Sequence, residues 1–289
     1  MKKTQKTKKD FLCLLFILPS LAGMCFFYIV PFLSTLYYSL INNMADKKWA
    51  GFKHFGSLFA NDLYMQAGRN TLLFILASVP LGMAAALLLV LALKDKKWGK
   101  TVLFFLLIPL IVPSGTTIAF WKSVFGKTGL ISSLWQIAGN KPLSLENSGW
   151  AFAVIVIVFL WKNISFSIVL FWSGINWIPK AYYEQSQIDG ATSWEQFKYI
   201  TWIYLSPTTF VVLLMSIVNS FKVFKEVYML YGAYPTPSIY MLQHYMNNQF
   251  TAMNMQKLSA SAWVMFVVLG AMLWIVYKLQ CRMTDYSGG

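Results

Sequence analysis

Long apolar stretches separated by short polar segments dominate the hydrophobic pattern of this chain. A helix needs about 20 apolar residues to cross the roughly 30 Å hydrocarbon core of a bilayer. Stretches of that length occur six times, and five of them contain no Asp, Glu, Lys, Arg or His. They are Phe11–Leu40, Asn70–Leu93, Thr101–Trp121, Trp150–Gly174, Tyr199–Phe221 and Leu258–Tyr277. The pattern predicts an all-α polytopic membrane protein with six transmembrane helices, because lipid leaves the backbone few other ways to satisfy its hydrogen bonds.

Composition supports the bilayer as the solvent. Of the 289 residues, 57% are hydrophobic and 12% are charged, whereas in soluble domains roughly a quarter of the residues are charged. The first apolar stretch follows five lysines and so resembles a signal peptide. It is too long for one and lacks an evident small-residue cleavage site, so we predict an uncleaved first helix.

Nearly all of the lysines and arginines that give the chain its net charge of +14 lie in the tails and in short loops between the apolar stretches. Five lysines precede the first apolar stretch, and four more lie in the loop 94–100. Dense Lys and Arg mark cytoplasmic segments, which explains the basic charge without a nucleic-acid partner. We predict a cytoplasmic N-tail of residues 1–10, a single transmembrane domain of residues 11–280, and a cytoplasmic C-tail of residues 281–289.

The residue clusters that catalysis needs are missing from the sequence. Gly-Lys-Thr occurs at residues 99–101 and 126–128, but the earlier glycine of a phosphate-binding loop is replaced by Lys94 and Trp121. The two histidines, His54 and His244, lack a metal-ligand spacing. We predict that the chain is not an enzyme and binds no metal and no cofactor.

One polar segment, residues 179–207, interrupts the apolar pattern; we call it the polar loop. Its residues predict a short helix over Lys180–Ile188 that ends at Gly190, since glycine commonly follows a helix end. A second helix starts at once, because both Thr192 and Ser193 fit the capping-box pattern. By itself, such a helix-turn-helix could be an interfacial connector between two spans.

The polar loop and the residue before it, Ile178, have the sequence IPKAYYEQSQIDGATSWEQFKYITWIYLSP. This sequence resembles the cytoplasmic signature loop of ABC importer permeases. In that loop a Glu-Ala-Ala stretch, an Asp-Gly-Ala turn and a Pro-containing end recur. The positions that match are Glu184, Asp189, Gly190, Ala191, Phe197, Ile200, Thr201, Leu205 and Pro207. Gln185 and Ser186 replace the alanines of the pattern, and Ile203 stands where a proline is usual.

Other segments resemble the carbohydrate-importer permeases of the same class. The specific resemblance is to the partner that precedes its sister permease in a heterodimer. They are WAGFKHFGSLF from residue 49, RNTLLF from residue 69, LIPLIVPSGTTIAFWKSVFGKTGLIS from residue 107 and FKVFKEVYMLYGAYP from residue 221. The resemblance runs from about Phe11 to Tyr277. It implies the ABC type I importer permease fold, with residues 11–280 as the permease domain.

The resemblance also implies a function and a set of partners. The chain would be the permease of an ATP-driven importer in the bacterial cytoplasmic membrane, moving a sugar or oligosaccharide by alternating access. It would form a heterodimer with a sister permease, dock on a cytoplasmic ATPase dimer that binds ATP and Mg, and receive substrate from an extracytoplasmic solute-binding protein. The polar loop would be the coupling helix, with Glu184, Asp189, Gly190, Ala191 and Phe197 as its ATPase-coupling residues.

A sugar route needs polar partners and flat apolar faces inside the spans. The predicted residues of the substrate pathway are Thr117, Trp121, Lys162, Asn163, Trp172 and Asn219. Lys162 lies near mid-membrane, where an ionisable residue is a functional candidate; it could contact substrate, snorkel to the interface, or pair with Glu226. The segment Val227–Gln256 is too polar to span, and we expect it outside, over the cavity mouth or against the binding protein.

A second class of protein stays open at this point. An autonomous secondary transporter or channel for a small polar solute would need neither an ATPase nor a binding protein. Such carriers use intramembrane carboxylates or inverted repeats, and the six apolar stretches contain no Asp or Glu. Because similar permeases carry glycerol-phosphate esters, a sugar substrate is an expectation from the resemblance alone.

Overall fold

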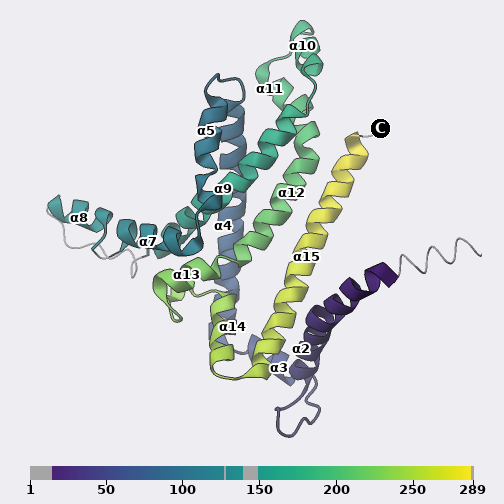
Figure 1. Ribbon diagram of the computed structural model, residues 1–289, viewed down its shortest axis with the longest axis vertical. Coiled ribbons are helices and arrows are strands. Elements are labelled where there is room, and N and C mark those ends of the chain that lie inside the picture. The colour runs from purple at the N-terminus through teal and green to yellow at the C-terminus, as the bar shows by residue number, and fades with distance from the viewer. Residues whose placement is uncertain (1–14, 127, 139–148, 288–289) are drawn as a thin grey trace, which may run out of the picture. The chain divides into compact units, whose positions relative to one another are not determined.

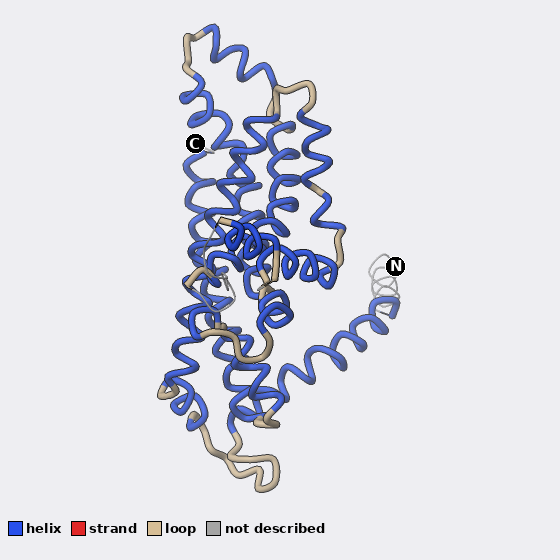
Figure 2. The backbone as a smooth tube through the Cα atoms, turned by 90° about the vertical axis from the view of Figure 1, so that its left-hand side faces the viewer, coloured by secondary structure: helices blue, strands red, loops and turns tan. Residues whose placement is uncertain are grey.

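The computed structural model describes residues 15–126, 128–138 and 149–287, and within these ranges it contains helices and loops but no strand (Figure 2). The predicted N-tail, residues 1–10, lies outside them. By their internal contacts the described residues form two compact units: residues 15–62 with 246–268, and residues 63–126, 128–138 and 149–245 with 269–287. We call them unit 1 and unit 2. The predicted single domain of residues 11–280 stays a prediction.

Five helical segments are long and apolar enough to cross a membrane, and they correspond to five of the six predicted spans. They are Leu15–Leu40, α4 (Asp62–Leu93), α9 (Ala151–Asn176), Ser193–Tyr231, and Met255–Cys281 within α15 (Met255–Ser287). α4 begins eight residues before the predicted start at Asn70. An all-helical polytopic membrane protein is confirmed.

The remaining predicted span, Thr101–Trp121, is a bent pair of helical segments rather than one straight helix. α5 (Gly99–Leu106) and α6 (Ile108–Ile111) run in one direction, and α7 (Ser114–Phe125) leads away toward α8 (Leu130–Ile137). The two halves meet at 102°, and Figure 1 shows α7 and α8 crossing the direction of α5. Val112 has an extended ψ of 126°, the conformation that a following proline imposes, and Pro113 cannot donate a backbone hydrogen bond.

Unit 1 is held by aromatic packing between the first helix and the early part of α15. The first helix contains one π turn, η1 (Cys25–Ile29), followed by α2 (Val30–Leu40). The ring centroids of Phe32 and Trp263 lie 4.5 Å apart, and the indole Nε1 of Trp263 donates a 3.1 Å hydrogen bond to Thr35 Oγ1. α3 (Lys53–Phe59) completes the unit.

One buried cluster of unit 2 joins α9 to α4, α5 and α12 (Trp202–Phe221). Its buried residues are Ala86, Val90, Leu93, Leu103, Ile168, Phe171, Ile175, Leu205 and Val212. Gly174 allows α9 and α12 to approach closely, since a Cβ there would lie 2.7 Å from Thr208 Oγ1 and 2.8 Å from Leu205 Cδ2. This contact joins the fourth and fifth predicted spans.

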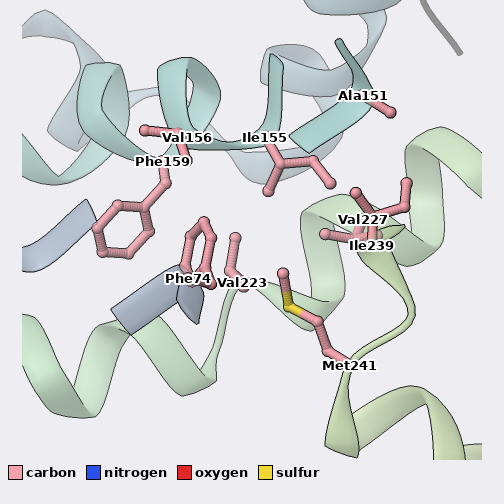
Figure 3. Close-up of a cluster of buried hydrophobic side chains, with 9 residues drawn as sticks. All are labelled: Phe74, Ala151, Ile155, Val156, Phe159, Val223, Val227, Ile239 and Met241. Carbon is pink, nitrogen blue, oxygen red and sulfur yellow. The ribbon is translucent and has the colours of Figure 1, made fainter. Parts of the chain in front are cut away.

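A second buried cluster joins α4 and α9 to the segment that follows α12 (Figure 3). That segment folds as α13 (Phe224–Tyr231), η4 (Pro237–Ile239) and α14 (Leu242–Thr251). The cluster contains Phe74, Ala151, Ile155, Val156, Phe159, Val223, Val227, Ile239 and Met241. The segment predicted to be too polar for a span therefore contributes apolar side chains to the core.

Hydrogen bonds from α4 fix the loop between α13 and α14. The Asn70 Nδ2 donates to the carbonyl oxygens of Pro237 at 2.7 Å and Tyr240 at 2.9 Å. The backbone N–H of Leu242 donates to Thr71 Oγ1 at 3.0 Å. These bonds satisfy backbone groups that no helix would satisfy.

His244, in α14, is fully buried. Its Nδ1 accepts a 3.3 Å hydrogen bond from the backbone N–H of Met241, and its ring lies edge-on to Phe224 at a centroid distance of 4.8 Å. Burial lowers the pKa of His244 to about 4, because desolvation disfavours the imidazolium. The side chain is therefore neutral at physiological pH.

Candidate functional site

The polar loop has the helix-turn-helix structure that its residues predict. Pro179 is the N-cap of α10 (Lys180–Ile188), and Asp189 is its C-cap. Gly190 follows with φ +79°, a left-handed conformation that is costly for residues with a Cβ. A Cβ at Gly190 would meet nothing within 4 Å, so the glycine is required by backbone conformation and not by close packing.

The second helix starts with one of the two predicted capping boxes. Thr192 Oγ1 accepts from the backbone N–H of Glu195, and the Glu195 carboxylate accepts from the backbone N–H of Thr192 at 2.7 Å. This capping box begins α11 (Ser193–Gln196), which continues through a π turn, η3 (Phe197–Thr201), into α12. The polar loop is thus joined to the fifth span without a break in the helix.

The polar loop exposes large apolar side chains at its tip. Ile188 is 86% exposed and Trp194 is 68% exposed. Of the predicted coupling residues, Glu184, Asp189 and Gly190 are exposed, while Ala191 and Phe197 are partly buried. Phe197 stacks on Trp194 with a centroid distance of 5.6 Å, so it supports the exposed indole.

Two other segments of unit 2 lie at the same end as the polar loop. The Lys94 ammonium, at the start of the lysine-rich loop 94–100, lies 5.0 Å from the ring centroid of Tyr183 in α10. Near the C-terminal end of α15, the Gln280 side chain accepts a 3.4 Å hydrogen bond from Ser206 in the first turns of α12. Figure 1 shows α10 and α11 beyond the upper ends of α5 and α12.

A small pocket lies toward the other end of α12, and we call it the Lys162 pocket. It has a volume of about 130 Å³ and is lined by Phe159, Lys162, Asn163, Asn219, Lys222, Val223 and Glu226. These residues come from α9, from the end of α12 and from α13. Three of the six predicted pathway residues, Lys162, Asn163 and Asn219, therefore meet in one place.

Lys162 and Glu226 form an ion pair across this pocket. The Lys162 Nζ lies 2.5 Å from Glu226 Oε1, and the exposed fractions of the two side chains are 27% and 8%. Pairing with Glu226 was one of the three possibilities for Lys162, and the structure shows that it occurs. A buried carboxylate needs such a partner, because an isolated charge in a low-dielectric interior is costly.

The other three pathway residues lie elsewhere. Thr117 and Trp121 are buried in α7, where Thr117 Oγ1 donates to the carbonyl oxygen of Pro113 at 3.2 Å. Trp172 lines a separate, larger pocket of about 630 Å³ between α5 and α9. Thr117 thus bonds to its own helix, as Thr in membrane helices often does.

Trp121 belongs to an aromatic cluster between α7, α9 and α13. Its ring stacks on Phe125 at a centroid distance of 5.2 Å and meets Trp161 edge-on at 5.6 Å. Leu230 of α13 packs on the same cluster. Among the described residues, the buried Nε1 of Trp121 has no hydrogen-bond partner.

Sequence reasoning missed three residues of the Lys162 pocket: Phe159, Lys222 and Val223. Lys222 follows Asn219 by three residues, and its Nζ donates to Asn219 Oδ1 at 3.3 Å. The i, i+3 spacing of Asn219 and Lys222 at the end of the predicted fifth span was the available signal. Phe159 and Val223 could not be distinguished from other apolar residues of the spans.

Apolar helices long enough to span a membrane, a polar loop continuous with one of them and a charged pocket between helices indicate a membrane protein of the transport class. The chain belongs to the family of binding-protein-dependent transport system inner membrane components, whose sequence profile matches residues 71–283. Permeases of this family are transport components, so the prediction that the chain is not an enzyme is confirmed.

Curated relatives and solved structures agree with this family. The chain is 29% identical to the probable ABC transporter permease protein YesP of Bacillus subtilis, over 99% of the chain and 96% of that protein. It is 30% identical to the trehalose/maltose transport system permease protein MalF of Thermococcus litoralis, over 76% and 77%. The fold is similar, with a TM-score of 0.84 and 21% identity over 98% and 100% of the two chains, to a bacterial ABC transporter involved in the import of alginate.

Proposed function

We propose that the chain is the membrane permease of an ATP-driven importer that receives its substrate from an extracytoplasmic binding protein. The polar loop carries this proposal. Its helix-turn-helix lies at one end of unit 2, is continuous with the fifth span, and exposes Ile188 and Trp194 among acids and amides. Apolar side chains gathered in a polar, exposed segment are typical of a surface that binds another protein.

The partner that fits this surface is the cytoplasmic ATPase. A helical stretch runs from Ser193 in the polar loop to Tyr231 in α13 and includes Glu226, which holds Lys162. Closure of an ATPase dimer would displace the polar loop, and the helix would carry that displacement to the Lys162 pocket. The π turn at Phe197–Thr201 and Pro207 within α12 are places where such a helix can bend.

In this proposal ATP and Mg bind to the ATPase, and the permease chain itself holds no cofactor. The permease alternates between an outward-open and an inward-open arrangement, which requires a packing of helices with two stable states. The predicted coupling residues, Glu184, Asp189, Gly190, Ala191 and Phe197, provide the exposed acids, the turn and the support for Trp194.

The orientation follows from the same arrangement. If the polar loop meets a cytoplasmic ATPase, then the loop 94–100 and the C-terminal end of α15 are cytoplasmic too, since all three lie at one end of unit 2. The dense lysines of the loop 94–100 and of the N-tail agree with this side. The loop between α13 and α14 then faces the extracytoplasmic side, where a binding protein would dock.

The proposed substrate is a sugar or oligosaccharide, and the second permease is a homologous sister chain. The names of curated relatives mention trehalose, maltose and lactose. The Lys162 pocket offers carboxamides, charged groups and the ring of Phe159, and such groups suit hydroxyl-rich ligands. Of the predicted pathway residues, Lys162, Asn163 and Asn219 are therefore the strongest candidates for contact with substrate.

The test is the composition of the assembly. The tagged chain is extracted mildly from its native membrane, and the proteins that stay bound are identified by mass spectrometry. The expected result is one ATPase and a second permease of similar size. Recovery of the chain alone in a stable fold would contradict the proposal and favour an autonomous transporter.

A variant pair sharpens this test at the tip of the polar loop. Ile188→Asp places a charge on the surface proposed to meet the ATPase and should release the ATPase while the chain stays in the membrane. Met253→Asp is the matched control, because Met253 is also highly exposed, at 74%, but lies in the turn between α14 and α15. Equal ATPase recovery from both variants would exclude the tip as the docking surface.

A further inference from the structure

The ionisable groups that line the Lys162 pocket are mainly cationic. Two lysines, Lys162 and Lys222, line it together with one carboxylate, Glu226, so the formal charge of its ionisable groups is 2 − 1 = +1. The ion pair is not equally accessible at its two ends, since the Lys162 side chain is 27% exposed and that of Glu226 only 8%. The cationic end of the pair is the one offered to a ligand.

Lys222 adds a second ammonium at the rim. Its side chain is exposed, and its Nζ donates a hydrogen bond to the neutral carboxamide oxygen of Asn219, at 3.3 Å. Within the described part of the chain, the Lys162–Glu226 pair is the ion pair of this pocket, and Lys222 has no carboxylate partner. An ammonium bonded only to a neutral acceptor gains most from an anionic oxygen, because charge-assisted hydrogen bonds are the stronger ones.

The amides add hydrogen-bonding capacity of both kinds. Asn219 Oδ1 accepts from Lys222, and the Asn219 carboxamide still has its two Nδ2 donors and a second lone pair on Oδ1. One N–H of Asn163 Nδ2 donates to the carbonyl oxygen of Phe159 at 2.9 Å, and the Asn163 carboxamide keeps its second N–H and its Oδ1. The two carboxamides therefore suit the hydroxyl groups of a sugar, whereas the two ammonium groups are what favours an anionic oxygen.

We propose that Lys222, together with Lys162, selects a saccharide that carries an anionic oxygen group, and that this group binds in the Lys162 pocket. The inference rests on the proposed function, since it names the substrate class of an importer. A volume of about 130 Å³ holds roughly four water molecules. That is room for one carboxylate or phosphate group and the adjoining part of a sugar ring, not for an oligosaccharide.

The experiment measures ligand binding without any transport. The chain, with the subunits it retains after mild extraction, is placed in lipid nanodiscs, and its melting temperature is followed as ligand is added. Sodium glucuronate, glucose 6-phosphate and glucose are compared at matched ionic strength. A ligand that binds the folded state raises the melting temperature according to its dissociation constant.

The expected result is stabilisation by glucuronate, glucose 6-phosphate or both, at concentrations where glucose has no effect. If only one anion acts, its chemistry identifies the group as carboxylate or phosphate. Lys222→Gln should weaken the binding of that anion about three- to ten-fold, the range between an exposed and a partly desolvated charge pair. Lys225→Gln is the matched control, because Lys225 is also exposed but does not line the pocket.

Four results would overturn the inference. One is equal stabilisation by glucose and the anions, and a second is no stabilisation by any of them. The third is an equal loss of anion binding in Lys222→Gln and Lys225→Gln, which would indicate general surface charge. A lower melting temperature of Lys222→Gln with unchanged preference for the anion would likewise show a structural role only. Each of these leaves the importer proposal intact, because that proposal depends on whether the ATPase copurifies.

Discussion

The polar loop and the Lys162 pocket both bring polar groups into an apolar protein, but they do so in opposite ways. The helix-turn-helix of the polar loop is built from one continuous segment, Lys180 to Gln196, and exposes its acids and its apolar tip. The Lys162 pocket joins residues 64 positions apart in the chain and buries its carboxylate. The first is suited to a soluble partner protein, and the second to a ligand that must leave water.

The difference shows which interactions support each region. In the polar loop the backbone itself is the support, through a positive φ at Gly190 and the capping box at Thr192. In the pocket the support is packing between helices, since α9 and α13 must be held together for Lys162 to reach Glu226. Substitutions in the two regions should therefore have different consequences.

The largest expected effect is on transport, from Gly190→Asp in the polar loop. The φ of +79° would cost a side-chain residue about 1–3 kcal/mol, and the turn would shift against the ATPase. We expect uptake of labelled substrate to fall about ten-fold or more while membrane insertion is kept. Gly51→Asp is the control, because Gly51 also has a positive φ, of 58°, but lies in unit 1; normal uptake by Gly190→Asp would refute the coupling role.

The next effect is on stability, from breaking the ion pair in the pocket. Lys162→Met leaves the buried Glu226 carboxylate without its cation, which should lower the free energy of unfolding by about 2–4 kcal/mol. SDS titration in mixed micelles, followed by tryptophan fluorescence, measures the change. The double variant Lys162→Met/Glu226→Leu should recover most of the loss, and a double variant as unstable as the single one would show that packing rather than charge is responsible.

A smaller effect tests the contact that links the two regions, between α9 and α12. Gly174→Val would force branched carbons against Thr208 and Leu205, and overpacking of this kind costs about 1–3 kcal/mol. The same SDS titration applies. Gly270→Val in α15 is the control, since a Cβ there meets nothing within 4 Å; equal losses in the two variants would mean that valine disturbs any of these helices.

The smallest effect concerns pH and His244, which lies in α14 next to Phe224 of α13. Because its folded pKa, about 4, is below the ordinary value near 6.5, the unfolded chain takes up the proton first. The contribution of the neutral His244 to stability is therefore fully present above pH 6.5 and is lost as the pH falls toward 4.

Between pH 7 and 5.5 this loss should be about 1 kcal/mol. His244→Gln should remove that part of the pH dependence. The check is to measure the free energy of unfolding of wild type and variant at pH 7 and at pH 5.5. If wild type and variant lose stability in parallel over this pH range, His244 is not the group responsible.

Much of the fold could be predicted from local patterns. The apolar stretches were enough to locate five spans, because a helix that crosses lipid needs about 20 predominantly apolar residues in a row. The third predicted span was incomplete in one respect. Pro109 and Pro113 lie within it, but whether a proline only kinks a helix or turns it by 102° depends on the neighbours that satisfy the freed backbone groups. At the junction of α5 and α6, which precedes this bend, Ser165 of α9 donates a 2.5 Å hydrogen bond to the carbonyl oxygen of Leu106.

In the candidate site, too, locally determined features could be predicted from the sequence and long-range contacts could not. Gly190 and Thr192 could be assigned their conformations from the sequence, because turns and caps depend on residues a few positions apart. The predicted pathway residues were chosen by residue type, and type alone could not show that Trp172 lies in a different pocket from Lys162. The ATPase-coupling and substrate roles stay predictions for the experiments above.

The sequence by itself determined that this protein is helical, crosses the membrane several times and carries a helix-turn-helix polar loop, because hydropathy and turn chemistry act over short distances along the chain. Only the tertiary structure decided that Lys162 pairs with Glu226, that Lys222 joins them, and that the segment after α12 folds back into the core. These contacts depend on how separate helices pack. Many pairings of polar groups were compatible with the same pattern, and packing allowed one of them.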